Sequence, residues 1–595
     1  MADIYINPNI GTGSGIGSEL DPFASWDEVT EASDTNYYIV RGTTQLITAR
    51  ADFNNLSNIK IRPYGGGADP IIEFYKTLSN TGDFAEVFTN VWVYDSSVEF
   101  TRALFVLGLG ELGDRNTSTW RNRVNFIARG GGRGPESFSV YGQWDTTDGA
   151  AAINIATITE GNPTIIALAS AGDNASGDDS PVLIAGNTGN VDINGYHIAT
   201  WTANDTFTID VDTSGGLQNN DGALNRSAKL YIYSDDNPIT KWGNTYYITS
   251  QDPIFQIRGT SANISIKGIA TKYGYAVEII RDTSDGIEII RVTGEHCRQH
   301  LRIVGSPTNC RIVDPVCYRA GEQAYYLTGT PGAGNRLIRP QAYDLGGSDF
   351  IGGIYCPNCN AASSFLISRP LIQRINRDPY WPGECYSLYT DGSSNNVIFK
   401  GGYLSDSEIG FLHTFNNPQD VYFIGIIGDT ANMGSWQQIT TNGSSTNIYN
   451  CTFKNVFIGS RYSKTTDAMN FTALDKNNIY ISNGDTGSIG LLVNDPIDDS
   501  TGATLVEDYN IFSGFDTNKQ RADEGALIIP FGANNFTADP LLDSNYEPAS
   551  NSPAIRSGIN ISVTVLTDSQ GRLLPIVPDR GAGGRYSRRK ADIGL

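Results

Sequence analysis

Short apolar stretches alternate with glycine, asparagine and aspartate turns along the central part of the chain. Their starting points are spaced by 24, 25, 29, 32 and 24 residues, and no helix-period stretch interrupts them. A unit of this length holds two or three strands and cannot bury its own apolar face, so neighbouring units must stack and share one core. Strand-only units stacked in parallel predict an all-β parallel β-helix with rungs about 4.8 Å apart. The six stretches begin at Ile287, Arg311, Arg336, Phe365, Val397 and Val421.

The segment GECYSLYTDGSSNNVIFKGGYLSDSEIGFLHTFNN, residues 383–417, contains nearly the same pattern twice. In a parallel stack, residues that are one unit apart lie directly above one another. The 24-residue spacing of the last two apolar stretches therefore predicts that Glu384 lies against Glu408 on the neighbouring rung. It predicts the same relation between Tyr389 and His413.

The N-terminal segment contains a motif of its own. Residues 5–9 (YINPN) are followed by a Gly/Ser loop and then by residues 22–26 (PFASW). This order resembles the opening of right-handed parallel β-helix proteins of the pectate-lyase-like class, in which it leads into a capping helix. Ser25 and Glu28 form a capping box ahead of the segment WDEVTEA, which favours a helix there. Such a helix is expected to cover the open end of the coil.

The rung pattern lapses between about residues 112 and 222. Residues 162–214 resemble a small β-barrel module that recurs in bacteriophage tail proteins, although ALASAGDNASGDDS replaces that family's usual His-Gly-Phe/Leu turn. We therefore expect a right-handed parallel β-helix with an N-terminal capping helix and an inserted small β-barrel module. The expected domains are an N-terminal cap with the first rungs at 1–111, an inserted β module at 112–222 with its barrel at about 150–214, a central β-helix at 223–490 and a C-terminal β region at 491–595.

The composition limits the partners of the chain. Its formal net charge of −22 opposes binding to nucleic acid and to anionic membrane surfaces. No run of about 18 apolar residues is present, and the opening residues lack the basic and apolar segments of a secretory signal. We therefore expect no nucleic-acid partner, no membrane partner and no export by the usual signal route.

Cysteine and histidine positions give no metal-binding pattern. The seven cysteines are an odd number in a long chain, so a dense disulfide framework is not expected and most of them are expected to be buried thiols. Cys356 and Cys359 form a lone CxxC without a second pair, and His296 and His300 lie in a strand-and-turn pattern. No cofactor is expected to be required, although the pattern leaves room for a structural or substrate-bridging Ca²⁺.

A long groove on a stacked coil suits an extended polymer, and polysaccharide is the leading candidate. Sugar rings stack on aromatic faces, and their hydroxyls bond to carboxylates and arginines. The region from Arg374 to Phe415 concentrates these residue types, although a turn-rich surface also gives some clustering by chance. The expected sugar-binding residues are Arg374, Arg377, Asp378, Tyr380, Trp381 and Tyr389. The expected catalytic residues are Glu384, Glu408, Asp391 and His413.

Two stacked glutamates repel one another when both are ionised, which raises the pKa of one toward the range of a general acid. A carboxyl separation of about 5 to 5.5 Å suits a retaining glycosidase and one of about 6.5 to 9.5 Å an inverting one, and the sequence does not choose between them. Carboxylates outnumber basic groups in the cluster, which favours hydrolysis. Two alternatives stay open: a polysaccharide lyase with a His or Tyr base, and a glycan-binding tail fibre or adhesin without catalysis.

The resemblance to pectate-lyase-like depolymerases of the bacteriophage tailspike type implies more than the fold. It implies cleavage of a bacterial capsular polysaccharide or exopolysaccharide, assembly as a homotrimer, and a place in the virion tail with action outside the cell. Secretion as a separate enzyme is the alternative location.

Overall fold

The structure is a computed structural model of the 595-residue chain. It describes residues 1–554 with internal gaps, and every structural statement below concerns the described residues. The positions outside them are 12, 79, 96–103, 106–143, 147–151, 171–178, 190–191, 204, 217–218, 226–228, 234, 243–245, 250–252, 275, 298, 321–322, 346–349, 376–383, 440–442, 465–470, 495–503, 522–532, 545, 547 and 555–595.

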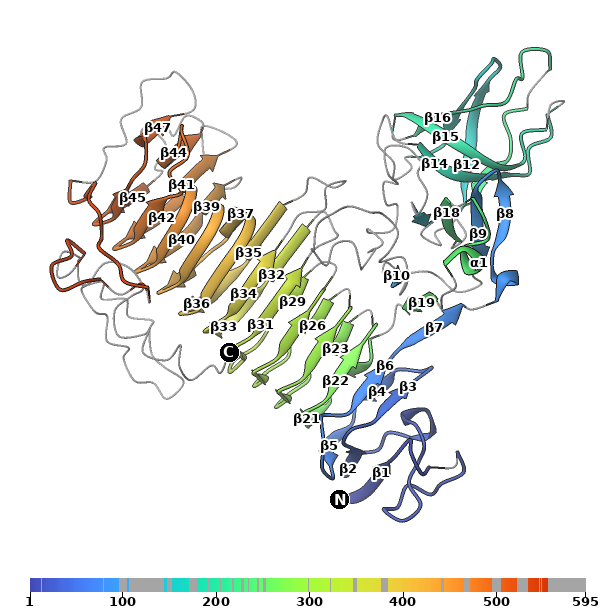
Figure 1. Ribbon diagram of the computed structural model, residues 1–595, viewed down its shortest axis with the longest axis horizontal. Helices are drawn as coiled ribbons and strands as arrows, with labels where there is room; N and C mark the ends of the chain where they lie inside the picture. Colours follow the sequence, from blue (N-terminus) through green and yellow to red (C-terminus); the bar gives the residue numbers. More distant parts are fainter. Residues whose placement is uncertain are drawn as a thin grey trace.

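The described chain is all-β, and most of its strands belong to two large parallel sheets. The strand pairings form three parallel rows, which we call ladders one, two and three. Each coil of the chain adds a strand to each ladder in that order, so the coils stack along one axis (Figure 1). Ladder one is the 13-stranded sheet of β1 (Ala2–Ile6), β2 (Thr35–Val40), β5 (Ser57–Tyr64), β21 (Ala262–Lys267), β24 (Glu288–Ile290), β27 (Arg311–Val313), β30 (Arg336–Ile338), β33 (Asn360–Ser368), β36 (Asn395–Lys400), β38 (Val421–Ile424), β40 (Ser444–Tyr449), β42 (Phe471–Lys476) and β45 (Thr504–Asp508).

Ladders two and three together form the 21-stranded sheet, because three long strands, β37 (Tyr403–Asn416), β39 (Ile427–Ile439) and β41 (Thr452–Lys464), belong to both. The other strands of ladder two are β3 (Thr44–Leu46), β6 (Ile71–Glu73), β22 (Ala270–Lys272), β25 (Thr293–Glu295), β28 (Val316–Tyr318), β31 (Gln341–Leu345), β34 (Leu371–Ile375), β43 (Ile479–Ser482) and β46 (Ile511–Ser513). The other strands of ladder three are β4 (Ala51–Asn54), β20 (Phe255–Arg258), β23 (Ala276–Ile280), β26 (Gln299–Gly305), β29 (Gln323–Gly329), β32 (Phe350–Pro357), β35 (Glu384–Asp391), β44 (Ile489–Asn494) and β47 (Thr517–Arg521).

The predicted stacking of repeat units is confirmed, with two corrections of register in ladder one. The spacings of 25, 32 and 24 residues agree with the pairs Arg311–Arg336, Phe365–Val397 and Ile398–Tyr422. The predicted spacings of 24 and 29 are wrong by one residue, because Glu288 pairs with Arg311 and Arg336 pairs with Leu366. A slip by one residue exchanges the inward and outward faces of a strand, and the stretches at 311 and 336 each begin on an outward arginine.

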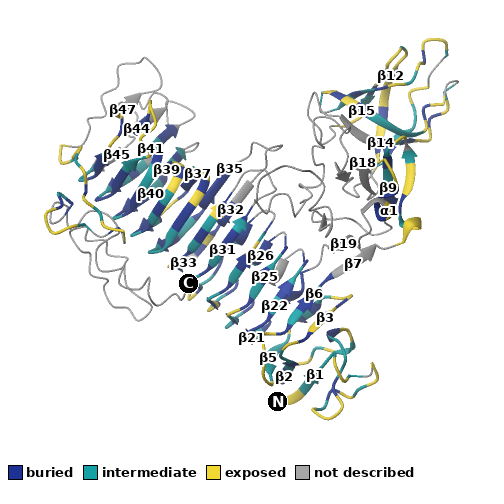
Figure 2. Ribbon diagram, viewed as in Figure 1, coloured by how far each residue is buried: buried dark blue, intermediate teal, exposed yellow. Residues whose placement is uncertain are grey.

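A continuous apolar column runs along the inward face of ladder one. Ile266, Ile289, Ile312, Leu337, Ile367, Phe399, Phe423 and Ile448 pair successively from coil to coil and are all buried. Figure 2 shows buried strands through the length of the stack. Each coil therefore shares its core with the coils above and below, which is why units this short can fold.

The apolar column ends at Asp475, which pairs with Ile448, has 0% exposed surface and pairs with Glu507 on the next coil. The Asp475 carboxylate accepts hydrogen bonds from the hydroxyls of Tyr462 at 2.7 Å, Tyr480 at 2.9 Å and Ser460 at 3.0 Å. The side chain of Asn478 donates a further bond to it. Burial raises the pKa of Asp475 above its usual value, although the hydrogen bonds from Tyr462 and Tyr480 oppose this rise.

We expect the stability of the wild type relative to Asp475→Asn to fall as the pH rises from about 3.5 to 7. A carboxyl whose folded pKa lies above the unfolded value of about 3.9 binds its proton more tightly in the folded protein. Its stabilising contribution is complete below the unfolded pKa and is lost as the pH rises through the folded pKa. Thermal unfolding midpoints of both proteins across this range measure the difference. A difference that is constant or grows with pH contradicts the assignment.

The first coils are interrupted by a long insertion. The chain leaves the stack after β6 and resumes at β20, which pairs directly with β4 through Phe255 and Ala51. The insertion therefore covers more of the chain than the 112–222 segment in which the repeat pattern lapses. Its antiparallel strands have the same apolar composition as the rungs, so the sequence pattern alone did not distinguish them. Its elements outside the barrel are β7 (Tyr75–Leu78), η2 (Thr81–Asp83), β8 (Ala85–Phe88), β9 (Val91–Asp95), β10 (Leu104–Phe105), β11 (Trp144–Thr146), β18 (Lys229–Tyr233), α1 (Pro238–Trp242) and β19 (Tyr246–Thr249).

The insertion contains a six-stranded closed antiparallel barrel, as the sequence resemblance implies. Trp201 and Phe207 fill its centre with ring centroids 4.7 Å apart. Figure 1 shows the barrel projecting to one side of the stack. Its strands follow the order β12 (Ile153–Thr159), β13 (Thr164–Leu168), β16 (Thr206–Ile209), β15 (Gly195–Ala203), β14 (Asp179–Ala185) and β17 (Ala223–Asn225).

The predicted N-terminal capping helix is wrong: the described segment forms only the 3₁₀ turn η1 (Trp26–Glu28). Ser25 caps it by accepting from the Asp27 amide, but the Glu28 carboxylate accepts from Ala24 rather than from Ser25. The Asp27 carboxylate accepts from the backbone amide of Thr48, which ties the turn to the first coil. The end of the core is covered by the Trp26 ring, which is 2% exposed. Among the described helices, none has both the length and the apolar content needed to cross a membrane.

Candidate functional site

The corner between ladders two and three changes along the stack. The connection at this corner grows from residues 273–275, between β22 and β23, to residues 376–383, between β34 and β35. In the next three coils, β37, β39 and β41 pass from ladder two to ladder three as continuous strands. A connection returns at residues 483–488, between β43 and β44. We call the surface of these three coils the bare corner, because no connecting loop arises from it.

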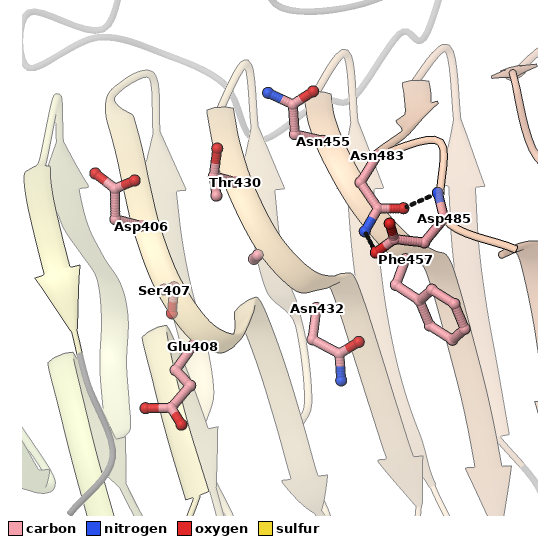
Figure 3. Close-up of a pocket in the computed structure, with 10 residues that line it drawn as sticks. Asp406, Ser407, Glu408, Thr430, Asn432, Asn455, Phe457, Asn483 and Asp485 are labelled. Carbon is pink, nitrogen blue, oxygen red and sulfur yellow. Dashed lines mark hydrogen bonds between the residues drawn. The ribbon is translucent and has the colours of Figure 1, made fainter.

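An open groove of about 860 Å³ lies over the bare corner (Figure 3). Carboxylates, amides and one aromatic ring line it, and four successive coils contribute residues. The lining consists of Asp406, Ser407 and Glu408 from β37, Thr430, Ala431 and Asn432 from β39, Asn455 and Phe457 from β41, and Asn483 and Asp485 after β43. Asp406 and Glu408 are exposed on either side of the buried Ser407.

Glu408 stands at an irregularity in the strand. Ser407 pairs with Ala431, whereas Gly410 pairs with Met433, so β37 has one residue more than β39 between these two pairs. An extra residue of this kind is a β-bulge, which bends the strand and re-aims the neighbouring side chains. The bulge at Glu408 and Ile409 therefore sets the direction in which the Glu408 carboxylate leaves the strand.

The described lining is acidic, with three carboxylates and no Lys, Arg or His. Arg374 lies beside this lining, because the register between β34 and β37 places it next to Asp406. Its guanidinium pairs with Asp344 and lies 5.7 Å from the centroid of the Tyr343 ring. The hydrogen bond to Asp344 raises the pKa of Arg374, and the Asp406 charge raises it further. Arg374 thus forms an ion pair with Asp344 and also interacts electrostatically with Asp406 at the edge of the groove.

The C-terminal segment around Tyr546 is bonded to a groove residue through Asp429. Asn455 donates from Nδ2 to Oδ1 of Asp429 at 2.7 Å, and the hydroxyl of Tyr546 donates to the other carboxylate oxygen. Tyr546 also lies 3.4 Å, hydroxyl to hydroxyl, from Tyr403 and under the ammonium of Lys454. Asp429 thereby links the C-terminal segment to a groove residue.

The predicted contact between Tyr389 and His413 is confirmed. The two residues pair between β35 and β37, and their rings stack with centroids 4.7 Å apart and planes 8° apart. They belong to a longer row on the outer face of ladder three, in which Tyr355 stacks on Tyr389 at 4.8 Å and His413 on Trp436 at 4.6 Å. Arg461 covers the far face of Trp436 at 4.3 Å. We call these four residues, Tyr355, Tyr389, His413 and Trp436, the ring stack.

The His413 ring has 0% exposed surface. A general base must reach the proton that it removes, either directly or through one water molecule. The ring stack therefore gives His413 a packing role in this structure.

Glu384 and Asp391 stand at opposite ends of β35. The Asp391 carboxylate accepts from the Tyr355 hydroxyl at 3.2 Å and from the side chain of Asn416, at the end of the strand away from the groove. The Glu384 side chain lies outside the described residues, so its contact with Glu408 stays a prediction. The 24-residue offset on which that prediction depends is present two residues further on, where Tyr386 pairs with Gly410.

Four of the expected sugar-binding residues lie in the connection 376–383, outside the described residues: Arg377, Asp378, Tyr380 and Trp381. This connection precedes the coil that carries Glu408.

Sequence reasoning missed the groove residues beyond β37. Asn432 follows Glu408 by 24 residues, which is the spacing of the preceding pair, Ser407 and Ala431. Phe457 follows Asn432 by 25 residues, which is the spacing of the stacked pairs on both sides. Extending the repeat past Val421 would have identified both residues. Asn483 follows Phe457 by 26 residues, which is the spacing of the neighbouring pair, Val456 and Ser482. Asp485 lies beyond the end of β43, and no stacked pair indicated it.

The described residues contain no group of three or more His, Cys, Asp or Glu side chains arranged to hold a metal ion. The three groove carboxylates are therefore spread around the lining rather than gathered on one point. All seven cysteines are buried free thiols, as predicted. Burial raises the pKa of the Cys359 thiol to about 12, which keeps it protonated.

Comparisons with known proteins give structural likeness only. No protein-family model and no curated protein matches the chain. Among solved structures, a complex of XylC with xylose covers 91% of this chain and 87% of its own at 10% identity, with a TM-score of 0.46. A glycoside hydrolase covers 90% and 97% at 10% identity, with a TM-score of 0.39.

Phage tailspikes are also among the matched structures. The Gp54 tailspike of Acinetobacter baumannii bacteriophage AP22, in complex with A. baumannii capsular saccharide, covers 82% of this chain and 70% of its own. Its identity is 7% and its TM-score 0.14. The structures to which this chain is similar thus include glycoside hydrolases and phage tailspikes, and none of these likenesses assigns it to a family.

Proposed function

We propose that this chain cleaves a bacterial capsular polysaccharide or exopolysaccharide by glycoside hydrolysis in the groove over the bare corner. The observation that carries the proposal is the open, acidic groove that crosses successive coils, with carboxylates, amides and an aromatic ring along it. Carboxylates and amides match sugar hydroxyls, and an aromatic ring matches the apolar face of a sugar. Without a loop on the bare corner, a polymer can enter from the side.

Glycoside hydrolysis needs two carboxyl groups on either side of the bond that breaks. One protonates the leaving oxygen, while the other attacks the sugar or activates a water molecule. We propose Glu408 as one of the two, because it is exposed in the groove and stands at the bulge that directs it outward. This chemistry requires no cofactor, so chelation of Ca²⁺ is expected to leave the rate unchanged.

Two residues compete as the partner of Glu408. Glu384 is the partner that the 24-residue register favours, and Asp406 is the partner that lies two residues away on the same strand. Residues i and i+2 of a strand are roughly 6.6 Å apart at their Cα atoms. Because the carboxyl groups extend from the Cα atoms on side chains of different length, their own separation decides the type of pair: about 6.5 to 9.5 Å for an inverting pair and about 5 to 5.5 Å for a retaining pair.

The products of cleavage test the proposal. Incubation with capsular polysaccharide from a susceptible host is expected to release reducing ends without new absorbance near 235 nm. Absorbance at that wavelength would signal an unsaturated sugar and establish the lyase alternative. Binding of the polymer without release of fragments would establish the non-catalytic fibre or adhesin.

The finer fold and assembly form part of the same proposal. We propose that the stacked coils are a right-handed parallel β-helix of the tailspike type, which the motifs at 5–9 and 22–26 support. The chain would then act as a homotrimer in a virion tail, or as a secreted protein in the alternative. Light scattering of the purified chain is expected to give three times its 64.4 kDa mass, and a monomer would contradict the trimer.

A further inference from the structure

We infer that the glycan bound in the groove is uncharged and that it lies along the axis of the stack. This inference rests on the proposed function, since it names the class of substrate that the same groove would accept. Its basis is the charge and arrangement of the described lining. It narrows the proposed substrate from any bacterial surface polysaccharide to an uncharged one.

The charge of the lining opposes an anionic glycan. Asp406, Glu408 and Asp485 give the groove three carboxylates, and none of the described residues lining it is a cation. A cleft lined by charges of one sign concentrates its field inside the cleft. A uronic acid, sulfate or phosphate group on the polymer would enter against this field, and the net charge of −22 adds to the repulsion.

Arg374, the described cation beside Asp406, does not relieve this repulsion. Arg374 forms two hydrogen bonds to the Asp344 carboxylate, through Nε and Nη2. It stands next to Asp406, at the edge of the groove. Asp344 and Asp406 together bring two negative charges to its one positive charge, so this edge has no net positive charge to offer a polyanion.

The neutral polar groups of the lining match hydroxyl and acetamido groups. Asn432, Asn455, Asn483 and Thr430 offer both donors and acceptors, whereas a carboxylate only accepts. Asn455 gives one donor to Asp429. Asn483 donates to the Asp485 carboxylate at 2.6 Å and accepts from the Asp485 backbone amide at 3.1 Å (Figure 3). Each amide group still has a second N–H and a second lone pair for a ligand. An uncharged sugar can satisfy such a lining with its own hydroxyls.

The direction of the polymer follows from the origin of the lining. Four successive coils contribute, and neighbouring strands are about 4.8 Å apart, so the lining extends for roughly 14 Å along the stack axis. In the other direction, each coil contributes only a few consecutive residues, such as 406–408. A short stretch of extended glycan therefore fits along the axis, crossing β37, β39 and β41.

The inference also bears on the type of reaction. β-Elimination removes the proton next to a uronic acid carboxylate, and the negative charge that develops on this carboxylate is stabilised most strongly by a cation. The described lining supplies no cation for this purpose. An uncharged glycan has no such carboxylate, so its cleavage in this groove must be hydrolytic.

Binding to matched polymers tests the inference without requiring turnover. Glu408→Gln is presented with an array of bacterial polysaccharides, and with hyaluronan beside its carboxyl-reduced form, which has the same linkages without the charge. We expect at least tenfold tighter binding to the uncharged member of a pair at 20 mM salt, with a smaller ratio at 500 mM. The variant itself removes one groove charge, so the preference is measured under conditions that work against it.

Two outcomes overturn the inference: equal or tighter binding of the anionic member, or failure of every uncharged polysaccharide on the array to bind. If an uncharged polymer binds and the wild type releases no reducing ends from it, the proposed hydrolysis fails while the substrate class stands. The two claims are therefore distinguishable by the same pair of measurements.

A charge change inside the groove provides the second test. Asn432→Lys is expected to raise the affinity for hyaluronan at least fivefold, because it places a cation in the acidic lining. Gln419→Lys makes the same change of charge at an exposed position on the turn between ladders three and one, and is expected to change the affinity less than twofold. Equal effects of the two variants would assign the repulsion to net charge rather than to the groove, and would overturn the inference.

Discussion

Replacing Glu408 with Gln is expected to lower the rate of polysaccharide cleavage at least about 100-fold, with no change in the thermal unfolding midpoint. A general acid or base contributes about 10² to 10⁴ to the rate of a reaction, and an amide cannot supply this chemistry. The side chain is exposed, so its replacement removes no packing from the core. Reducing-end release at saturating polymer measures the rate.

Three further variants complete the experiment. Glu160→Gln is the matched control, since Glu160 is an exposed glutamate in the inserted barrel region, and its rate is expected to equal that of the wild type. Glu384→Gln and Asp406→Asn identify the second carboxylate, because the true partner is expected to lose as much activity as Glu408. If Glu408→Gln retains more than half of the wild-type rate, Glu408 is not catalytic.

Among the proposed variants, Tyr389→Ala is expected to lower the free energy of unfolding most, by about 3 to 5 kcal/mol. This range is typical of a large buried aromatic side chain, and loss of ring stacking adds to the cavity. Tyr389 is 2% exposed and contacts the rings of Tyr355, Tyr386 and His413, at centroid distances of 4.8, 6.0 and 4.7 Å. The thermal midpoint and the unfolding rate in denaturant measure the effect.

Tyr318→Ala provides the comparison for the ring stack. Tyr318 also stacks on a tyrosine of the next coil, Tyr343, at 5.2 Å, but it is 39% exposed and leaves a smaller cavity. Its replacement is expected to cost less than half as much as Tyr389→Ala. An equal or smaller loss for Tyr389→Ala would show that the ring stack contributes no more to stability than the partly exposed pair of Tyr318 and Tyr343 does.

The stacked coils could be predicted because their pattern is local and repeated. Each coil places apolar residues at the same points, so six stretches sufficed to show units of about 25 residues. Register was harder, since moving the start of a stretch by one residue, from Ile287 to Glu288, hardly changes the spacing of the repeat but exchanges the inward and outward faces of the strand. The pairings that were right join stretches with the same order of large apolar residues, such as Phe365 and Val397.

The N-terminal cap could not be predicted from its capping motif. Ser25 does cap the turn, but the following residues, Val29 and Thr30, are β-branched and favour extended backbone. Competing hydrogen bonds also decided the outcome, because Asp27 binds the backbone of Thr48 and Ala49, far along the chain. A local motif contains no information about such distant partners.

The candidate site was predicted in part. The repeat correctly placed Tyr389 against His413, yet residue type alone could not tell that the histidine is enclosed by the rings around it. Whether an outward residue is exposed depends on its neighbours in the adjacent coils. The groove itself arises from the length of the corner connections in successive coils, and Asp485 joins it from a turn that lies outside the repeat.

The central claim is that glycan binds and is cleaved over the bare corner. A crystal structure of Glu408→Gln with an oligosaccharide of its polymer tests this most directly. We predict that the sugar crosses β37, β39 and β41 along the stack axis, with residue 408 within hydrogen-bonding distance of a glycosidic oxygen. A sugar bound on the face of ladder one or on the inserted barrel, with the groove empty, would contradict the account.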